Sequence, residues 1–374
     1  MINYLILPVS KYAKSFCYYE SPENSGKKDI IDFKVLKDAV LYAIKNKCGL
    51  NVLYGDEPLP EKYEKELEKI EHIKILPIGL RKHYKKGIYI IEEQDLKSSY
   101  TIKKNNELNL ILRIGKKKLP GLSDIFNSLL WKFKRLNLVF TDIQNFTETD
   151  FDLYKIQLKK IGDTVNKLYR NLNNIELSFL TDRMFLVNMN NCDAGIKHLT
   201  VAPDGKFYLC PGFYYTGKEN ELGSIKEGYN IKNEYLLHLK NAPLCSNCDS
   251  WHCKRCYWLN QKLTQELNTP SSEQCKVSHL ERNETRKISD KLRKSKHFRN
   301  LNEIPGINYI DPFEILNLES ELPEEDKIII ISELLSKPLE KLSIRELLMY
   351  LYKVDKEAII KLKNYLSIKY GSKK

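Results

Sequence analysis

The sequence has no long apolar run and no sign of a segment that carries the chain into or across a membrane. No stretch approaches the roughly 18 consecutive apolar residues that a transmembrane helix needs, so we expect no membrane partner. The opening residues MINYLILPVSKYAKSFCYYE lack a basic segment and a small-residue cleavage site, and we interpret them as a first β-strand rather than a signal peptide. The expected location is the cytoplasm, where thiols stay reduced.

Several familiar binding and catalytic motifs are also missing. The chain has no phosphate-binding Walker loop, no G-x-G-x-x-G after a predicted strand and no convincing Ser–His–Asp set. Its formal net charge is +12, but no nucleic-acid recognition motif accompanies this charge. A solvated basic surface or an acidic peptide partner accounts for the charge equally well, so nucleic acid is not an expected partner.

Cysteine is scarce except in one region, and its spacing there is typical of metal sites. The chain has 9 cysteines in 374 residues, an odd number that favours metal over disulfides in a reduced protein. The residues 245–256 read CSNCDSWHCKRC, and each C-x2-C pair lets two thiolates from one turn bind the same metal ion or cluster. The candidate ligands in this region are Cys192, Cys210, Cys245, Cys248, Cys253, Cys256 and Cys275.

The number of these cysteines limits what they hold. One structural zinc needs only the four cysteines of residues 245–256, with His252 as a spare ligand. That assignment leaves Cys192, Cys210 and Cys275 unexplained. Either two zinc ions or two iron–sulfur clusters with one open coordination position would use all seven cysteines. The residues alone do not decide between these two assignments.

The first 180 residues alternate short apolar runs with amphipathic segments. The runs, rich in Ile, Leu and Val, lie at residues 3–9, 50–55, 73–79, 108–114, 136–143 and 175–180. Helical periodicity appears between them at residues 32–47, 60–70, 121–134 and 150–171. Such alternation predicts βαβ units around a parallel sheet. Six strands are too few for a closed eight-stranded barrel, so a partial barrel or an open doubly wound sheet is expected.

Three segments depart from this rhythm. Residues 81–107 are polar with one strand-like run at 88–91, and we interpret them as an insertion or irregular crossover. Residues 199–210, LTVAPDGKFYLC, predict a hairpin because PDG is a strong turn signal between two alternating runs. After residue 276 the chain has no cysteine, and its pattern predicts helices, the first of which is basic. The spacing of Ser343 and Glu346 is that of a capping box.

The order of the cysteines resembles the SPASM domain of peptide-modifying radical SAM enzymes. That domain has a C-x(9–15)-G-x4-C unit, which Gly205 completes here, then a run of four cysteines and a trailing cysteine; two intervals of the run are one residue shorter in this chain. The resemblance implies two [4Fe-4S] clusters. It assigns Cys245, Cys248, Cys253 and Cys275 to one cluster and Cys192, Cys210 and Cys256 to the other. Many family members supply a fourth thiolate to the latter from the stretch at residues 183–191, which has no cysteine here.

The same resemblance implies that the first half of the chain is the family's partial (β/α)6 barrel. Residues 53–60, LYGDEPLP, are similar to the family's G-G-E-P-L stretch, in which Glu57 would contact the amino group of S-adenosylmethionine; an ordinary strand-to-helix turn also explains them. The family's C-x3-C-x2-C loop should follow the first strand, but residues 9–26 contain only Cys17. We therefore expect no cleavage of S-adenosylmethionine, no metal on Cys17, and a core role for the Cys48 thiol.

The expected fold is α/β, with three parts. Residues 1–185 would form a degenerate radical-SAM-like partial barrel, 186–280 a SPASM-like iron–sulfur domain and 281–374 a C-terminal helical region. Residues 275–286, CKVSHLERNETR, resemble the CXXX repeat peptide maturases, which implies a ribosomally made, cysteine-containing precursor peptide as partner. The first functional hypothesis is an iron–sulfur protein that matures this peptide or presents it to a partner modification enzyme. The alternative is a non-catalytic binding module with structural zinc.

Overall fold

The computed structural model describes residues 2–22, 29–103, 107–242, 244–294, 298 and 301–306. They fall into two compact units. The larger unit comprises the described residues of Met1–His238 and Asp249–Ile304, and the smaller one includes Leu239–Cys248. The expected capping box of Ser343 and Glu346 lies outside the described residues. In the part of the chain that the structure describes, no helix is both long and apolar enough to cross a membrane.

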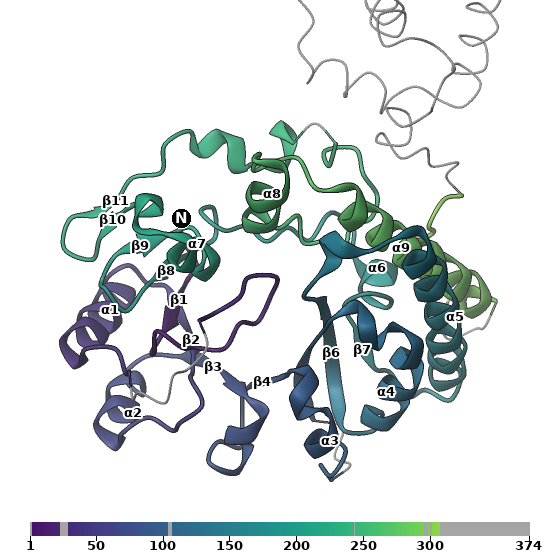
Figure 1. The fold of residues 1–374 in the computed structure, drawn as a ribbon, viewed down its shortest axis with the longest axis horizontal. Helices are drawn as coiled ribbons and strands as arrows, with labels where there is room; N and C mark the ends of the chain where they lie inside the picture. Colours follow the sequence, from purple (N-terminus) through teal and green to yellow (C-terminus); the bar gives the residue numbers. More distant parts are fainter. Residues whose placement is uncertain are drawn as a thin grey trace, which may run out of the picture. The chain divides into compact units, whose positions relative to one another are not determined.

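A nine-stranded sheet forms the framework of the larger unit (Figure 1). The strands lie in the order β7-β6-β5-β4-β3-β2-β1-β8-β9, and every neighbouring pair is parallel except β8 and β9. Because β1 to β7 follow one another in sequence order, the sheet is wound in one direction, as in a barrel. Their bounds are β1 (Tyr4–Pro8), β2 (Gly49–Leu53), β3 (His72–Pro77), β4 (Ile88–Ile91), β5 (Leu108–Ile114), β6 (Phe133–Phe140), β7 (Glu176–Leu177), β8 (His198–Val201) and β9 (Phe207–Tyr208).

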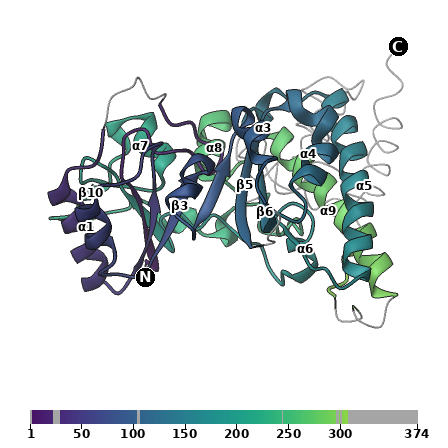
Figure 2. The same cartoon turned by 90° about the horizontal axis from the view of Figure 1, so that it is seen from below.

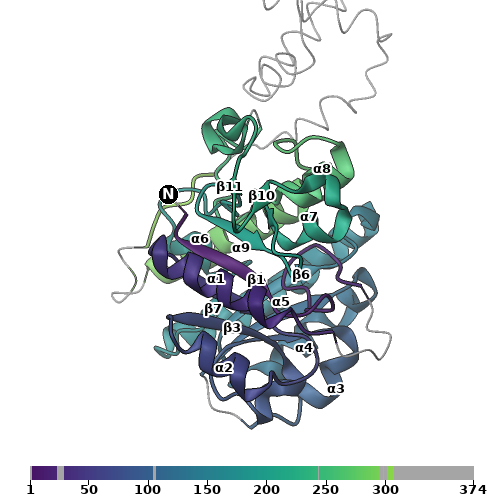
Figure 3. The same cartoon turned by 90° about the vertical axis from the view of Figure 1, so that its left-hand side faces the viewer.

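The helices cover the outer face of this curved sheet. Figure 3 shows α1 lying along β1, and Figure 2 shows α5 and α9 side by side on the β6 side. Asp32 begins α1 by accepting a hydrogen bond from the Lys34 backbone N–H at 2.7 Å. The α-helices are α1 (Phe33–Lys45), α2 (Glu61–Leu67), α3 (Leu96–Ser99), α4 (Leu122–Leu129), α5 (Glu148–Arg170), α6 (Asp182–Phe185), α7 (Pro211–Thr216), α8 (Tyr257–Thr264) and α9 (Ser272–Arg293). The α/β fold with an open, partial-barrel sheet is therefore confirmed.

One expectation about the strands was wrong. Residues 88–91 do not belong to an irregular crossover: they form β4, which pairs in parallel with both β3 and β5. The run is only four residues long and polar sequence surrounds it, yet Tyr89, Ile90 and Ile91 are buried. The predicted hairpin of residues 199–210 is confirmed as β8 and β9, and Gly205 in its turn has a φ of 75°, which favours glycine.

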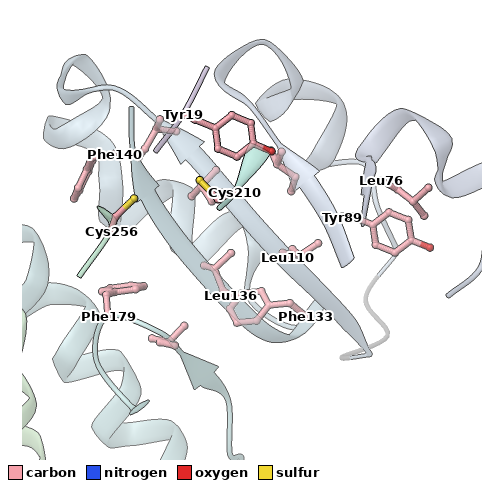
Figure 4. Packing of buried hydrophobic residues seen from close by; sticks show 14 of the residues in the cluster. Tyr19, Leu76, Tyr89, Leu110, Phe133, Leu136, Phe140, Phe179, Cys210 and Cys256 are labelled. Atoms are coloured by element: carbon pink, nitrogen blue, oxygen red, sulfur yellow. The ribbon is translucent and has the colours of Figure 1, made fainter. Parts of the chain in front are cut away.

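The two faces of the sheet pack differently. Leu110 and Leu112 belong to the large cluster beneath the helices, and Figure 4 shows Leu110 among its neighbours. A smaller cluster on the other face contains Ile6, Ile75, Ile90, Ile111 and Val139. Because side chains alternate along a strand, Arg113 shares the inner face with Ile111. Phe16 and Tyr18, from the loop after β1, pack against this inner cluster.

Candidate metal centre

The loop after β1 crosses the inner face of the sheet. In Figure 1 this purple segment leaves β1 and extends toward β6. Arg113 of β5 holds the loop: its Nε donates to the Cys17 carbonyl at 3.1 Å and its Nη2 to the Tyr19 carbonyl at 3.0 Å. The third nitrogen, Nη1, pairs with Glu92 at 2.6 Å. Cys17 is thereby fixed at the carboxyl end of the sheet, the edge at which parallel barrels bind their ligands.

Two of the candidate ligands stand at the beginnings of helices. Cys210 is the N-cap residue of α7 and Cys256 is that of α8. The first N–H groups of a helix have no partner inside the helix, so they are available to a sulfur at this position. The backbone N–H of Phe213 donates to the Cys210 carbonyl at 3.1 Å, and that of Asn260 donates to the Cys256 carbonyl at 2.9 Å, so both cysteines are fixed at the first turn of their helix.

These two helices touch each other near their cysteines. Trp258 of α8 donates from Nε1 to Thr216 Oγ1 of α7 at 2.8 Å. A Cβ atom added to Gly212 would stand 2.6 Å from Trp258 Cδ1, so only glycine permits this approach. Figure 4 shows Cys210 and Cys256 among the buried residues, together with Tyr19.

Cys192 is bound to the segment that leads to Cys256. Its backbone N–H donates to the Lys254 carbonyl at 2.8 Å. Its thiol lies 3.9 Å from Nε2 of His198, which also donates to the Cys192 carbonyl at 2.9 Å. His198 is buried against Tyr4, and this burial lowers the pKa of its imidazole to about 4, so the ring is neutral at pH 7.

Cys17, Cys192, Cys210 and Cys256 therefore form what we call the four-thiol group. Burial raises the pKa of each thiol, that of Cys17 to about 12. The neighbouring thiolates act in the same direction: Cys17 and Cys192 raise the pKa of Cys210, and all three raise that of Cys256. The segments of these cysteines are in contact: Cys192 bonds the Lys254 carbonyl, α7 packs against α8, and the Tyr19 ring of the Cys17 loop stacks on Tyr215 of α7.

The other four candidate ligands belong to different units. Cys245 and Cys248 lie in the smaller unit, where the Cys248 N–H bonds the Cys245 carbonyl at 3.2 Å in a tight turn. Cys253 and Cys275 lie in the larger unit, the latter in the first turn of α9. All nine cysteines are free of disulfides, and Cys48 is buried as a core thiol, as expected. Within the described ranges, no three His, Cys, Asp or Glu side chains stand in the arrangement of a single metal ion's ligands.

Buried charges fix the chain that leads to Cys253 and Cys256. The carboxylate of Asp249 accepts from Nε of Arg282 on α9 at 3.0 Å, and its carbonyl accepts from Nε of Arg183 on α6 at 2.6 Å. The Arg183 guanidinium also lies 3.9 Å from the centre of the Trp251 ring. Both arginine side chains are almost completely buried, so their charges depend on this pairing.

His252 takes part in a second buried network. Its Nε2 lies 3.0 Å from Glu281 Oε2 on α9, and the Tyr154 hydroxyl of α5 donates to Glu281 Oε1 at 2.6 Å. The network ties the cysteine-bearing segment to two long helices. The contact engages Nε2 alone, and Nδ1 of His252 is buried without a hydrogen-bond partner among the described residues.

Glu57 lies at the same edge of the sheet as the loop after β1. It is exposed in the turn between β2 and α2. Two contacts join this turn to the first loop: Lys14 pairs with Asp56 at 3.4 Å, and a Cβ on Gly55 would meet Ser10 at 3.4 Å. The position suits a group that binds a ligand at the carboxyl end of the strands.

The fold has counterparts among solved structures, although no protein-family model and no curated protein matches the chain. A histidine-tagged anSMEcpe with bound AdoMet matches with a TM-score of 0.52 and 14% sequence identity, over 79% of this chain and 97% of that one. Native anSMEcpe with bound AdoMet and Cp18Cys peptide, or Kp18Cys peptide, gives TM-scores of 0.49 and 0.48, both at 14% identity. These two cover 76% and 75% of this chain and 96% of each of those chains. The likeness at this identity concerns the fold alone: the chain has a radical-SAM-like fold.

Proposed function

We propose that this chain is an iron–sulfur protein of a peptide-modification system that does not cleave S-adenosylmethionine. The SPASM-like order of its cysteines and its radical-SAM-like fold support this proposal together. In this view the protein binds a ribosomally made, cysteine-containing precursor peptide in the cytoplasm and matures it or presents it to a partner enzyme. The peptide would approach the carboxyl end of the strands, where the loop after β1 and Glu57 lie.

The observation that carries the proposal is the proximity of Cys192, Cys210 and Cys256. They are far apart in sequence, yet a backbone hydrogen bond and helix packing bring their segments together, and Cys210 and Cys256 stand at the N-termini of α7 and α8. Thiolates with N–H donors around them are the protein environment of iron–sulfur clusters. The residues present thus fit such a group, which when bound supplies electron transfer or, with an open iron, Lewis acidity.

The second predicted cluster would be held by Cys245, Cys248, Cys253 and Cys275. Its proposal rests on the order of the cysteines in the sequence. A centre whose ligands are distant in sequence couples metal binding to the folding of the segments that supply them.

Metal analysis tests the function directly. Protein purified anaerobically from iron-replete cells should be brown and carry about eight irons per chain, four for each of two clusters, with matching sulfide. The Cys210→Ala variant should lose one cluster and Cys245→Ala the other. Stoichiometric zinc without iron in the wild-type protein would overturn the proposal in favour of the zinc-binding module.

The proposed absence of S-adenosylmethionine cleavage follows from ligand count. The reaction needs a four-iron cluster with three protein thiolates and one iron free for the cofactor, and the loop after β1 offers Cys17 alone. Reconstituted, dithionite-reduced protein should form no 5′-deoxyadenosine beyond a cluster-free control. Turnover that Glu57→Ala abolishes would show that a radical site exists after all.

A further inference from the structure

The role of Cys17 changes once its surroundings are known. By sequence alone it has no partner, since a single cysteine cannot replace the family's three-cysteine loop. We propose that Cys17 is the fourth ligand of a metal centre whose other ligands are Cys192, Cys210 and Cys256. This inference rests on the proposed iron–sulfur function and supplies the thiolate that residues 183–191 lack.

Direct contacts connect the loop of Cys17 to the helix that begins at Cys210. The Tyr19 ring stacks on the Tyr215 ring of α7, with 5.7 Å between the ring centres. Tyr19 is fully buried, and its carbonyl accepts hydrogen bonds from both Arg113 and the Ser15 hydroxyl. The loop is thus held from the sheet on one side and packs against α7 on the other, so Cys17 has little freedom to turn away.

Other contacts hold the Cys256 and Cys192 segments beside the beginning of α7. The contact of Gly212 with Trp258 joins the beginning of α7 to the beginning of α8, and so Cys210 to Cys256. The hydrogen bond from Cys192 to the Lys254 carbonyl joins the third segment. Four separate segments of the chain therefore each contribute one sulfur. Such convergence is expected of the ligands of a metal centre.

Cys210 and Cys256 are buried, and Cys17 and Cys192 are partly exposed beside them. A metal centre replaces the protons of its thiolate ligands, and the low dielectric constant of a buried site strengthens its attraction for them. A cluster core of irons and sulfides also spaces its thiolates more widely than a single ion does.

Cysteine variants test the proposal through metal content. After anaerobic reconstitution with ferrous iron and sulfide, Cys17→Ala should lose about half of the bound iron, as Cys210→Ala does. The double variant of these two should lose no more than either single one, because both remove the same centre. Cys48→Ala is the matched control, since Cys48 is a buried thiol outside the four-thiol group, and it should keep all its iron. Full iron content with an unchanged visible spectrum in Cys17→Ala would overturn the proposal.

A second measurement needs no variant and therefore does not depend on the folding of one. The wild-type protein is treated with iodoacetamide under native conditions, before and after cluster removal with EDTA and ferricyanide. Cys17 and Cys192 are both partly exposed in the structure, but their raised pKa makes alkylation slow, so the rate of reaction is followed over hours at alkaline pH. Both should be protected in the loaded protein and react after cluster removal. Equal alkylation of Cys17 in the two states would overturn its role as a ligand.

The two tests separate this inference from the proposed function. If Cys210→Ala keeps all its iron, or if the wild-type protein holds only zinc, the iron–sulfur proposal fails. The inference about Cys17 fails instead when Cys210 and Cys192 behave as ligands and Cys17 does not. Protection of Cys17 and Cys192 by zinc alone would support Cys17 as the fourth ligand, but it would overturn the proposal that the centre is an iron–sulfur cluster.

Discussion

The sheet and the cysteine-bearing segments of the larger unit are stabilised in different ways. Along β5 and β6 the core consists of apolar side chains such as Leu110, Phe133 and Leu136, all almost fully buried. Around the cysteines the buried residues include Arg183 and Arg282, which depend on specific partners. Apolar burial is non-directional and tolerates adjustment, whereas a buried charge is stabilising only while its partner is present.

This difference suggests two levels of stability in the same unit. The sheet is held mainly by apolar contacts, whereas the cysteine-bearing segments combine apolar contacts with the buried ion pairs of Arg183 and Arg282 and, by our proposal, with bound metal. Loss of metal should therefore loosen the segments around Cys192, Cys210 and Cys256 before it affects the strands. Hydrogen exchange of the loaded and metal-free protein would locate this loosening.

The largest effect is expected from a truncation in the sheet. Phe133→Ala removes a fully buried ring in β6 and should lower the free energy of unfolding by about 4 kcal/mol. Phe185→Ala is the control, since Phe185 is 57% exposed, and it should cost little. Urea denaturation of both variants measures this. Similar losses in the two would show that the sheet core is not the dominant source of stability.

A comparable but more local effect is expected at Asp249. Asp249→Ala leaves two buried arginines without their shared partner and should cost about 3 kcal/mol. The loss should appear first as faster hydrogen exchange in the cysteine-bearing segments. As a control, Asp163→Ala breaks a pair with Lys291 in which both side chains are 50% exposed, and should cost less than about 1 kcal/mol. Uniform destabilisation of the sheet by Asp249→Ala would contradict the two-level picture.

A third substitution acts on the contact between α7 and α8. Gly212→Ala places a methyl group against the Trp258 ring, which must move, and should cost about 2 kcal/mol by overpacking. The same change should weaken iron binding by the four-thiol group, because Cys210 and Cys256 begin these helices. Gly79→Ala meets no atom within 4 Å and serves as the control. Thermal unfolding and iron content that match the wild type would show that the helices adjust freely.

The sequence predicted the strands well and the site only in part. Apolar runs and their spacing identified six of the strands of the parallel sheet, because periodicity is a local property. The apolar pattern did not predict β4 as a strand of the sheet, because the run is short and its side chains are buried only through pairing with β3 and β5. The place of Cys17 beside the other thiols was missed for a related reason: it depends on Arg113, 96 residues further along the chain, and no local pattern reports such a contact.

The smallest expected effect on stability at neutral pH concerns the imidazole of His279 on α9. Burial lowers the pKa of its imidazole to about 4, with Arg282 and His252 acting in the same direction and Asp249 opposing them. The folded protein thus binds fewer protons than the unfolded chain between pH 6.5 and 4. This contribution to stability is complete above pH 6.5 and is lost as the pH falls toward 4, with a slope approaching about 1.4 kcal/mol per pH unit.

Removal of this imidazole should therefore weaken the acid sensitivity of the protein. Urea denaturation of the metal-free protein at pH 7 and pH 5 should show a smaller loss in His279→Gln than in the wild type, because the variant has no buried ring to protonate. His83→Gln, at an exposed histidine of the sheet half, should keep the wild-type dependence. An equal loss of unfolding free energy in His279→Gln and the wild type would mean that acid destabilises the protein through groups other than His279.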